Sequence, residues 1–428
     1  GPRLTVVPPI LVLVLAGGKS ERLHALGRMR TASALPFGGK YRIIDFTLSN
    51  CVHSGLYRIG VLTQYAPLSL QEHIGIGRAW DLDRRDGGIR LLPPYVRQRA
   101  TNWYRGTADA LVQNRNVIAD AQARHILVVS GDLIYKMDYG SLIARHEARG
   151  SVLTVVTTPS PDDEAERYGI VDVDGTGRVR GVEVRRDGGP GTQVSASIYL
   201  FRGRDLLARL ADPSLGPDLV ADVIRPMIEE GLPVHADPFD GYWHDVTTID
   251  SYYAASMDLL RPLPPINLND PDWLVYTPSE DRAPSLLGRS ADVASSMIAH
   301  GTRIEGTVRR SILFPGVHVG AGAIVEDSIV MHDTRILRGA RLHGAIIDKQ
   351  VRIGERAEVG VGEPVRHREH PHDLGGGLCV IGKGAEVPTG AKVGRNTLVE
   401  IGVRERDYGR DGVPSGSTVR PRPAGAAR

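Results

Sequence analysis

The chain has 428 residues, of which 41% are hydrophobic and 24% charged, and its formal net charge is +2. This length suggests two or three domains, and the small net charge excludes the strong positive field of a nucleic-acid-binding protein. Two cysteines, Cys51 and Cys379, argue against a disulfide framework and favour a cytoplasmic location. Because no apolar run reaches the ~18 residues of a transmembrane helix, we expect no membrane segment.

Residues 10–260 alternate short apolar segments with amphipathic ones. The predicted strands are Ile10–Ala16, Arg58–Thr63, His125–Ser130 and Ser151–Thr157. The predicted helices are Asp45–Ser54 and Thr107–Ala123, the second opening with a threonine cap. Alternation of this kind predicts a mostly parallel sheet with helices on its faces.

Residues 261–298 are rich in proline and show no periodicity, which predicts an extended linker lying against a domain. Residues 299–405 are expected to form one repeat domain, with a period of 17 residues over 317–359, a looser copy at 300–316, and small residues about every six positions at 379–394. Three columns of the repeat are Val319/Ile336/Ile353, Ala323/Ala340/Ala357 and Val325/Leu342/Val359. Short apolar steps with small residues at the corners predict a parallel β-helix.

Two segments depart from this repeat. Residues 365–377 (VRHREHPHDLGGG) interrupt it and predict a loop that projects from one coil. The loop histidines His367, His370 and His372 are interpreted as solvated. Residues 406–428 are rich in arginine, glycine and proline, so we expect a flexible tail.

The first chemical signal follows the first predicted strand, where Ala16 leads into Gly17 and Gly18. Glycines after a strand let backbone N–H groups approach phosphate oxygens, because no Cβ stands in the way. Arg22 then supplies a donor fork that suits phosphate. A tight turn that binds no ligand would show the same two glycines, so the glycine pair alone does not establish a phosphate-binding loop.

Further blocks accompany this loop. They are PFGGKYRIIDFTLSNCVHSGL (36–56), VLTQY (61–65), NWYRGTADA (102–110), SGDLIYKMDY (130–139) and YWHDVTTIDSYYAA (242–255). With these blocks in this order, the sequence resembles the ADP-glucose pyrophosphorylases over roughly residues 10–400. The resemblance implies a Rossmann-like, mostly parallel mixed sheet at 10–260, followed by a left-handed parallel β-helix.

The resemblance also implies an activity. The family joins a nucleoside triphosphate (ATP or GTP) to a sugar 1-phosphate with Mg²⁺ and releases pyrophosphate. Its members usually work as oligomers, so a homo-dimer or homo-tetramer is expected. Two polyanions must meet in this reaction, so the site needs cations and positioning more than an acid or a base.

The motifs assign candidate residues to three roles. Asp132, which follows the strand HILVVSG, and the distant Asp245 are expected to share Mg²⁺, with Arg22 as the third catalytic residue. The nucleotide-binding candidates are Ala16, Gly17, Gly18, Gln64, Tyr104, Gly106, Thr107 and Asp132. The substrate-binding candidates are Tyr168, Gly169, Arg185, Ser195 and Tyr199.

Several positions depart from the family pattern. Ser20 stands where the family has the third glycine of this loop. Ala32 and Ser33 stand where the family has a Lys-Pro pair whose lysine binds the phosphates. Arg28 or Arg30 could reach back to replace the lysine. On the sugar side, Arg185 replaces a lysine, and Ser197 and Thr247 replace glycines.

Three functions are compatible with these departures. The first is an active nucleotidyltransferase whose acceptor is glucose 1-phosphate or a cyclitol phosphate such as a valienol 1-phosphate. The second is a regulatory subunit, without the lysine, that modulates a catalytic homologue. The third is a protein unrelated to nucleotides whose β-helix is an acyltransferase domain. The retained Asp132 and Asp245 favour the first.

Overall fold

The computed structural model describes residues 9–94, 104–184 and 188–423. The chain divides into two compact units. The first comprises residues up to Gly18, Ile44–His244 and Asn269–Pro278, and the second Lys19–Ile43, Asp245–Leu268 and Ser279–Arg428. No helix in the described part of the chain is long and apolar enough to cross a bilayer.

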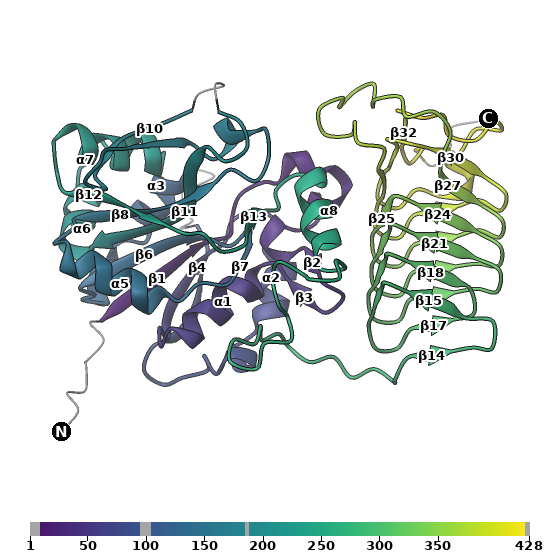
Figure 1. Cartoon of the computed structure of the whole chain (residues 1–428), viewed down its shortest axis with the longest axis horizontal. Helices are drawn as coiled ribbons and strands as arrows, with labels where there is room; N and C mark the ends of the chain where they lie inside the picture. The colour runs from purple at the N-terminus through teal and green to yellow at the C-terminus, as the bar shows by residue number, and fades with distance from the viewer. Residues whose placement is uncertain (1–8, 95–103, 185–187, 424–428) are drawn as a thin grey trace. The chain divides into compact units, whose positions relative to one another are not determined.

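The first unit is built on a mixed sheet that has nine strands among the described residues (Figure 1). The strands are β1 Ile10–Leu15, β4 Arg58–Leu62, β5 Gly88–Leu92, β6 His125–Ser130, β8 Leu153–Pro159, β9 Ile170–Val173, β10 Val179–Glu183, β11 Gln193–Arg202 and β12 Val234–Pro238. Their order is β10-β9-β11-β6-β1-β4-β5, with β8 and β12 added beyond β11. Strands β6, β1, β4 and β5 are parallel, and β11 runs antiparallel to β6. Two short strands, β7 Leu133–Tyr135 and β13 Trp243–Asp245, lie outside this sheet.

Helices cover both faces of the sheet. Leu11 and Leu13 of β1 belong to one core, whereas the alternating Val12 and Val14 face the opposite way and are also fully buried. A strand buried on both faces carries an unbroken apolar run, which is the pattern of ILVLVL in β1. The helices of this unit are α1 Ile44–His53, α2 Leu68–Ile74, η3 Arg78–Trp80, α3 Thr107–Gln113, α4 Arg115–Asp120, α5 Tyr139–Ala148, η4 Ala165–Arg167, α6 Gly203–Leu210, η5 Leu219–Ile224 and α7 Arg225–Glu229.

The predicted helix Thr107–Ala123 is two helices, α3 and α4, which meet at Asn114. The side chain of Asn114 donates to Ala110 O at 2.9 Å and to Tyr104 Oη at 2.8 Å, so this polar side chain is buried where the helix breaks. The predicted threonine cap is wrong. Thr107 is the first helical residue, and its Oγ1 accepts from Leu219 N at 3.0 Å.

Part of the predicted linker lies against the first unit, as expected. The ring of Trp273 stacks on His53 at a centroid distance of 4.6 Å, and its Nε1 donates to Asn50 Oδ1. Trp80 Nε1 donates to Tyr276 O at 3.1 Å. These contacts explain why Asn269–Pro278 groups with the sheet.

The second unit contains a parallel β-helix of stacked coils, with three sheets running along its length (Figure 1). One sheet is β14 Leu286–Leu287, β17 Arg303–Ile304, β20 His318–Val319, β23 Arg335–Ile336, β26 Arg352–Ile353 and β29 Glu386–Val387. The next is β15 Asp292–Ala294, β18 Thr307–Arg309, β21 Ile324–Glu326, β24 Arg341–His343, β27 Glu358–Val361 and β30 Lys392–Gly394. The third is β16 Met297–Ile298, β19 Ile312–Leu313, β22 Ile329–Val330, β25 Ala345–Ile347, β28 Cys379–Ile381, β31 Leu398–Val399 and β32 Thr418–Val419.

The columns of the 17-residue repeat are the registers of these sheets. Val319 pairs with Ile336, and Ile336 pairs with Ile353, on successive coils. The alanines of the second column, Ala323, Ala340 and Ala357, are fully buried at the corners. The first coil nevertheless begins at Leu286, inside the predicted linker. Its strand residue Met297 pairs with Ile312, a step of 15 residues, so this coil does not fit the 17-residue period.

The tail is more ordered than expected. Val419 of β32 pairs with Val399, and Val413 bridges to Val393, so two tail valines continue core columns of the β-helix. The short helix η6 Glu405–Asp407 interrupts the spacing between these columns. The predicted flexible tail at 406–428 is therefore wrong as far as residue 423; residues 424–428 lie outside the described residues.

Residues 19–43 and 245–268 complete the second unit. Their elements are η1 Glu21–Gly27, η2 Ala32–Ala34, β2 Pro36–Phe37, β3 Tyr41–Arg42 and α8 Ile249–Asp258. Tyr252 Oη donates to Pro36 O, and Tyr253 Oη donates to Asp327 O at 2.7 Å, so α8 connects both to the 19–43 segment and to the β-helix.

The deepest contact of the 19–43 segment is an ion pair. Arg30 Nη2 donates to Asp348 Oδ1 at 2.8 Å, with side chains only 5% and 1% exposed. Within the described residues, Arg30 Nε and Asp348 Oδ2 have no hydrogen-bond partner. Burial, together with the charges of Arg42 and Arg30, lowers the pKa of the neighbouring Lys349 to about 7. This cluster therefore contains an excess of cations, and Asp348 offsets part of it.

Replacing Arg30 by methionine should lower the free energy of unfolding by about 3–5 kcal/mol, because the buried carboxylate of Asp348 loses its partner. Arg352→Met is the matched control, since Arg352 and Glu405 form a half-exposed pair whose loss should cost less than about 1 kcal/mol. Chemical denaturation of the three proteins measures both differences. Equal stability of Arg30→Met and Arg352→Met would show that the buried pair does not hold the segment.

Candidate active site

The carboxyl ends of β6, β1 and β4 lie side by side at one edge of the sheet. Leu15 pairs with Ser130 on one side and with Leu62 on the other. The residues that follow these three strands therefore share this edge, where ligands bind in open α/β sheets. Among the candidates, Ala16, Gly17 and Gly18 follow β1, Gln64 follows β4 and Asp132 follows β6. The structure thus brings these five residues together, as the sequence predicts.

Gly17 is required by a close approach. A Cβ at this position would lie 3.0 Å from Gln64 Cβ and 3.0 Å from Gln64 N, so a side chain would force the two loops apart. Gly17 O also accepts from Tyr65 N at 3.2 Å. Gly18 differs, because a Cβ at this position would meet no atom within 4 Å and the residue is exposed. One glycine therefore joins the loops, and the next leaves its backbone accessible.

Tyr104 and Thr107 are held by structural contacts. Tyr104 Oη donates to Leu92 O at 3.0 Å, and burial raises the pKa of its hydroxyl. Gln64 Nε2 donates to Tyr104 O at 3.2 Å, which connects this segment to the edge formed by β4. Gly106 is another close approach, since a Cβ there would lie 2.4 Å from Pro217 O. The predicted nucleotide contacts of these residues stay predictions.

Four of the five substrate-binding candidates form one cluster. Gly169 O accepts from Ser195 N at 2.9 Å, and Ser195 Oγ hydrogen-bonds Tyr199 Oη at 2.7 Å. The ring of Tyr168 lies 5.2 Å from that of Trp243 in an edge-to-face contact. Trp243 Nε1 in turn donates to Ala196 O at 3.2 Å. Arg185, the fifth candidate, lies outside the described residues.

This cluster lies beside the same sheet edge. Strand β11 is antiparallel to β6, and Ile198 pairs with Val129, so the first half of β11 flanks the carboxyl end of β6. At this point β11 bulges against β8, between Ser195 and Tyr199. Ser197 lies in the bulge at φ 57°, a conformation that favours glycine. A glycine, as the family has at this position, would adopt this backbone conformation without strain, whereas Ser197 adopts it with strain.

The two predicted metal ligands lie in different units. Asp132 follows β6 in the first unit, is half-buried, and donates its N–H to Ser130 Oγ at 3.3 Å. Asp245 ends β13 and falls in the second unit, where Oδ1 accepts from Thr247 N at 3.0 Å and from Thr247 Oγ1. A carboxylate of this kind suits Mg²⁺. Their sharing of one ion stays a prediction.

The arginines after the glycine loop are paired with carboxylates of the second unit. Arg22 Nε donates to Asp373 Oδ1 at 2.7 Å, and Arg28 holds Glu400 with both nitrogens of its fork. With Arg30 bound to Asp348, both arginines proposed to replace the lysine have a carboxylate partner in this structure.

Two family departures contact each other. Ala32 N donates to the Oγ of Ser20 at 3.1 Å, and a glycine at position 20 could not accept this bond. Ser20 keeps a negative φ of −104°, as its predicted role in the loop requires. Sequence reasoning missed this contact, and it assigned no role to Trp243, Asp373 or Glu400. Trp243 could have been noticed, because it lies in the YWHDV block; the two acidic residues carry no local signal.

Known proteins match the chain over both units. The profile of the "Nucleotidyl transferase" family matches residues 11–261, and the "GlmU-like, C-terminal hexapeptide" profile matches residues 284–373. The predicted fold class, a Rossmann-like mostly parallel mixed sheet followed by a left-handed parallel β-helix, is confirmed.

Relatives extend over nearly the whole chain, and all three described next are named glucose-1-phosphate adenylyltransferase. The protein of Thermomicrobium roseum is 46% identical over 420 residues, covering 96% of this chain and 98% of the relative. That of Thermotoga neapolitana is 40% identical, with 96% and 99% covered. That of Acetivibrio thermocellus is 36% identical, with 96% and 97% covered. Because this identity spans both units, the chain belongs to the glucose-1-phosphate adenylyltransferase (ADP-glucose pyrophosphorylase) family of sugar-phosphate nucleotidyltransferases.

Proposed function

We propose that this chain transfers the adenylyl group of ATP to glucose 1-phosphate and releases pyrophosphate. The observation that carries the proposal is the shared edge of β6, β1 and β4, where Gly17, Gln64 and Asp132 meet. The names of the relatives favour ATP over GTP, and glucose 1-phosphate over a cyclitol phosphate. A homo-dimer or homo-tetramer and a cytoplasmic location belong to the same proposal.

The chemistry sets what the site must supply. An oxygen of the sugar phosphate attacks the α-phosphorus of ATP, and the bond to the β-phosphate oxygen breaks as pyrophosphate leaves. Asp132 and Asp245 would hold Mg²⁺, which offsets negative charge on the phosphates. The exposed backbone at Gly18 offers an N–H to a phosphate oxygen. Arg22 contributes a further positive charge.

The acceptor side is proposed to be the cluster of Tyr168, Gly169, Ser195 and Tyr199. Trp243 packs against Tyr168 and hydrogen-bonds the backbone of Ala196, which holds its ring in place. The rings of Tyr168 and Trp243 are proposed to line one side of the sugar pocket. Burial raises the pKa of Tyr199 to about 12, which keeps the hydroxyl protonated beside Ser195. Arg185 is expected to pair with the phosphate of the acceptor.

A direct assay tests the proposal. The full chain is incubated with Mg²⁺, ATP or GTP, and either glucose 1-phosphate or valienol 1-phosphate, and pyrophosphate is measured. We expect the fastest release with ATP and glucose 1-phosphate. Faster release with valienol 1-phosphate would show that a cyclitol phosphate is the acceptor. The absence of pyrophosphate release with every pair of substrates would contradict the proposed enzymatic activity.

Asp132→Asn should lower kcat by at least about 100-fold, because the amide removes negative charge from the place where Mg²⁺ is expected to bind. Asp120→Asn is the matched control, since Asp120 is an exposed carboxylate at the end of α4 in the same unit. The measurement is kcat at saturating Mg²⁺ for the three proteins. Full activity of Asp132→Asn would show that this carboxylate does not bind the metal.

The regulatory alternative rests on one observation. Position 32 carries no lysine, and Arg28 and Arg30 already hold carboxylates. If the missing charge limits the rate, Ala32→Lys should raise kcat by one to two decades, since a charge-assisted contact is worth on the order of 1.5–3 kcal/mol.

Ala32→Met is the control for that variant, because it adds length without charge at the same buried position. An equal effect of both substitutions would assign any change to packing. A low rate in the original chain that only the lysine rescues would favour the regulatory role.

A further inference from the structure

The loop that interrupts the β-helix presents two side chains from one turn. The backbone N–H groups of Asp373 and Leu374 donate to His370 O at 3.2 and 3.0 Å. This turn places residues three apart on the same side, so the side chains of His370 and Asp373 lie close together. The loop histidines are expected to be solvated, yet Asp373 and His370 are half-buried and His367 is buried.

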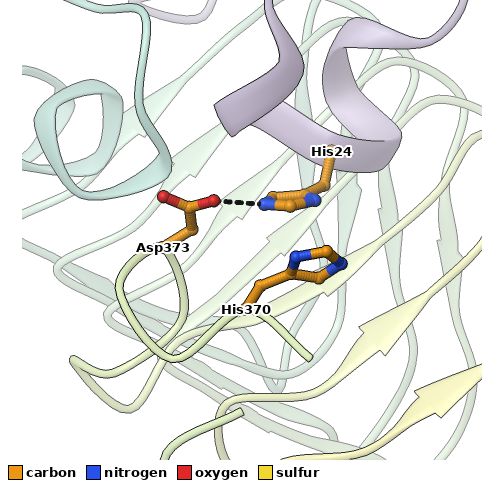
Figure 2. Close-up of side chains that lie close together, drawn as sticks. All are labelled: His24, His370 and Asp373. Carbon is orange, nitrogen blue, oxygen red and sulfur yellow. Dashed lines mark hydrogen bonds and ion pairs between the residues drawn. The ribbon is translucent and has the colours of Figure 1, made fainter. Parts of the chain in front are cut away.

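A third side chain reaches this pair from η1. His24 Nε2 and Asp373 Oδ2 are hydrogen-bonded at 2.8 Å, and the rings of His24 and His370 lie 4.3 Å apart (Figure 2). One nitrogen from each histidine and one oxygen of Asp373 all lie within 4.8 Å of one another. These three residues come from the same unit, although His24 is nearly 350 positions away in sequence.

The surrounding contacts hold the three side chains in place. Arg22 Nε donates to Asp373 Oδ1 at 2.7 Å, which fixes the carboxylate and leaves Oδ2 facing His24. His367 accepts from His370 N through Nδ1 at 3.0 Å and donates from Nε2 to Thr418 Oγ1, so it anchors the turn. Such outer contacts orient ligand side chains in metal sites.

The backbone of His24 also points to a local function. It has φ 48° and ψ −124°, a strained conformation for a residue with a side chain. Strain of this kind persists where the surroundings hold it, and here it directs a buried imidazole at Asp373.

We propose that His24, His370 and Asp373 bind a divalent transition-metal ion of the zinc class. Two imidazoles and one carboxylate are ligands that Zn²⁺ prefers, whereas Mg²⁺ prefers oxygen ligands throughout. Ligand atoms around tetrahedral zinc lie roughly 3.4 Å apart, given bonds of 2.0–2.2 Å. The ion would therefore replace the proton between His24 and Asp373 and widen their 2.8 Å contact. It would bring the more distant ligand atoms, which lie within 4.8 Å, closer together, and water would complete the fourth position.

The ion would join η1 to the loop of the β-helix. It would fix Asp373, the carboxylate that holds Arg22, and so fasten the segment after the glycine loop. The three proposed ligands are different residues from Asp132 and Asp245, at which Mg²⁺ is expected, and the inference does not depend on the proposed function.

The test uses the full chain after chelator treatment and dialysis. Zn²⁺ is titrated by calorimetry, and Co²⁺ by visible absorption, since four-coordinate cobalt absorbs far more strongly than six-coordinate cobalt. The expected result is one Zn²⁺ per chain, an intense Co²⁺ spectrum, and a higher Tm with Zn²⁺. No saturable binding of Zn²⁺ by the original chain would overturn the proposal.

His370→Ala removes one ligand from a half-buried loop position, and it should weaken Zn²⁺ binding by more than the roughly 10- to 100-fold that loss of an outer-shell partner costs. His372→Ala is the matched control, because His372 is exposed on the same loop outside the cluster. The control should bind like the original chain. Equal affinity of His370→Ala and His372→Ala would overturn the site, and the Tm of each variant without metal confirms that it folds.

Discussion

A buried ion pair between Arg30 and Asp348 connects residues 19–43 to the β-helix within the second unit. Both side chains are almost fully buried, so neither charge has water as an alternative partner. The pair holds residues 19–43 on the β-helix, even though these residues directly follow the glycine loop of the first unit. A segment expected to serve the nucleotide is thereby folded against a repeat domain that contains none of the proposed catalytic or substrate-binding residues.

The first unit depends on a simpler constraint. Parallel neighbours end at the same edge, so the order β6-β1-β4 is enough to bring Gly17, Gln64 and Asp132 together. The antiparallel β11 then starts beside that edge and adds Ser195 and Tyr199. Sheet topology thus places the nucleotide-side and acceptor-side candidates next to each other before any single side chain is considered.

Sequence reasoning succeeded where a signal is periodic or continuous. The apolar run of β1 and β6 and the 17-residue columns of the β-helix require only local patterns. It failed where a partner is distant. The first coil steps by 15 residues, the tail returns to the core through Val419, and His24 meets Asp373 across almost the whole chain. Nothing near Asp348 or Glu400 in sequence shows which arginine each will hold.

The ion pairs of Arg22, Arg28 and Arg30 differ in how far each arginine is exposed to water. Arg22 and Arg28 have side chains that are 36% and 53% exposed, so water can solvate their guanidinium groups as they leave their carboxylates. Their carboxylate partners are more buried, since the side chains of Asp373 and Glu400 are 15% and 9% exposed. Arg30 would leave a fully buried carboxylate, at a cost of about 3–5 kcal/mol. The Arg30 pair is therefore the most costly of the three to break, because neither of its side chains can be solvated where it lies.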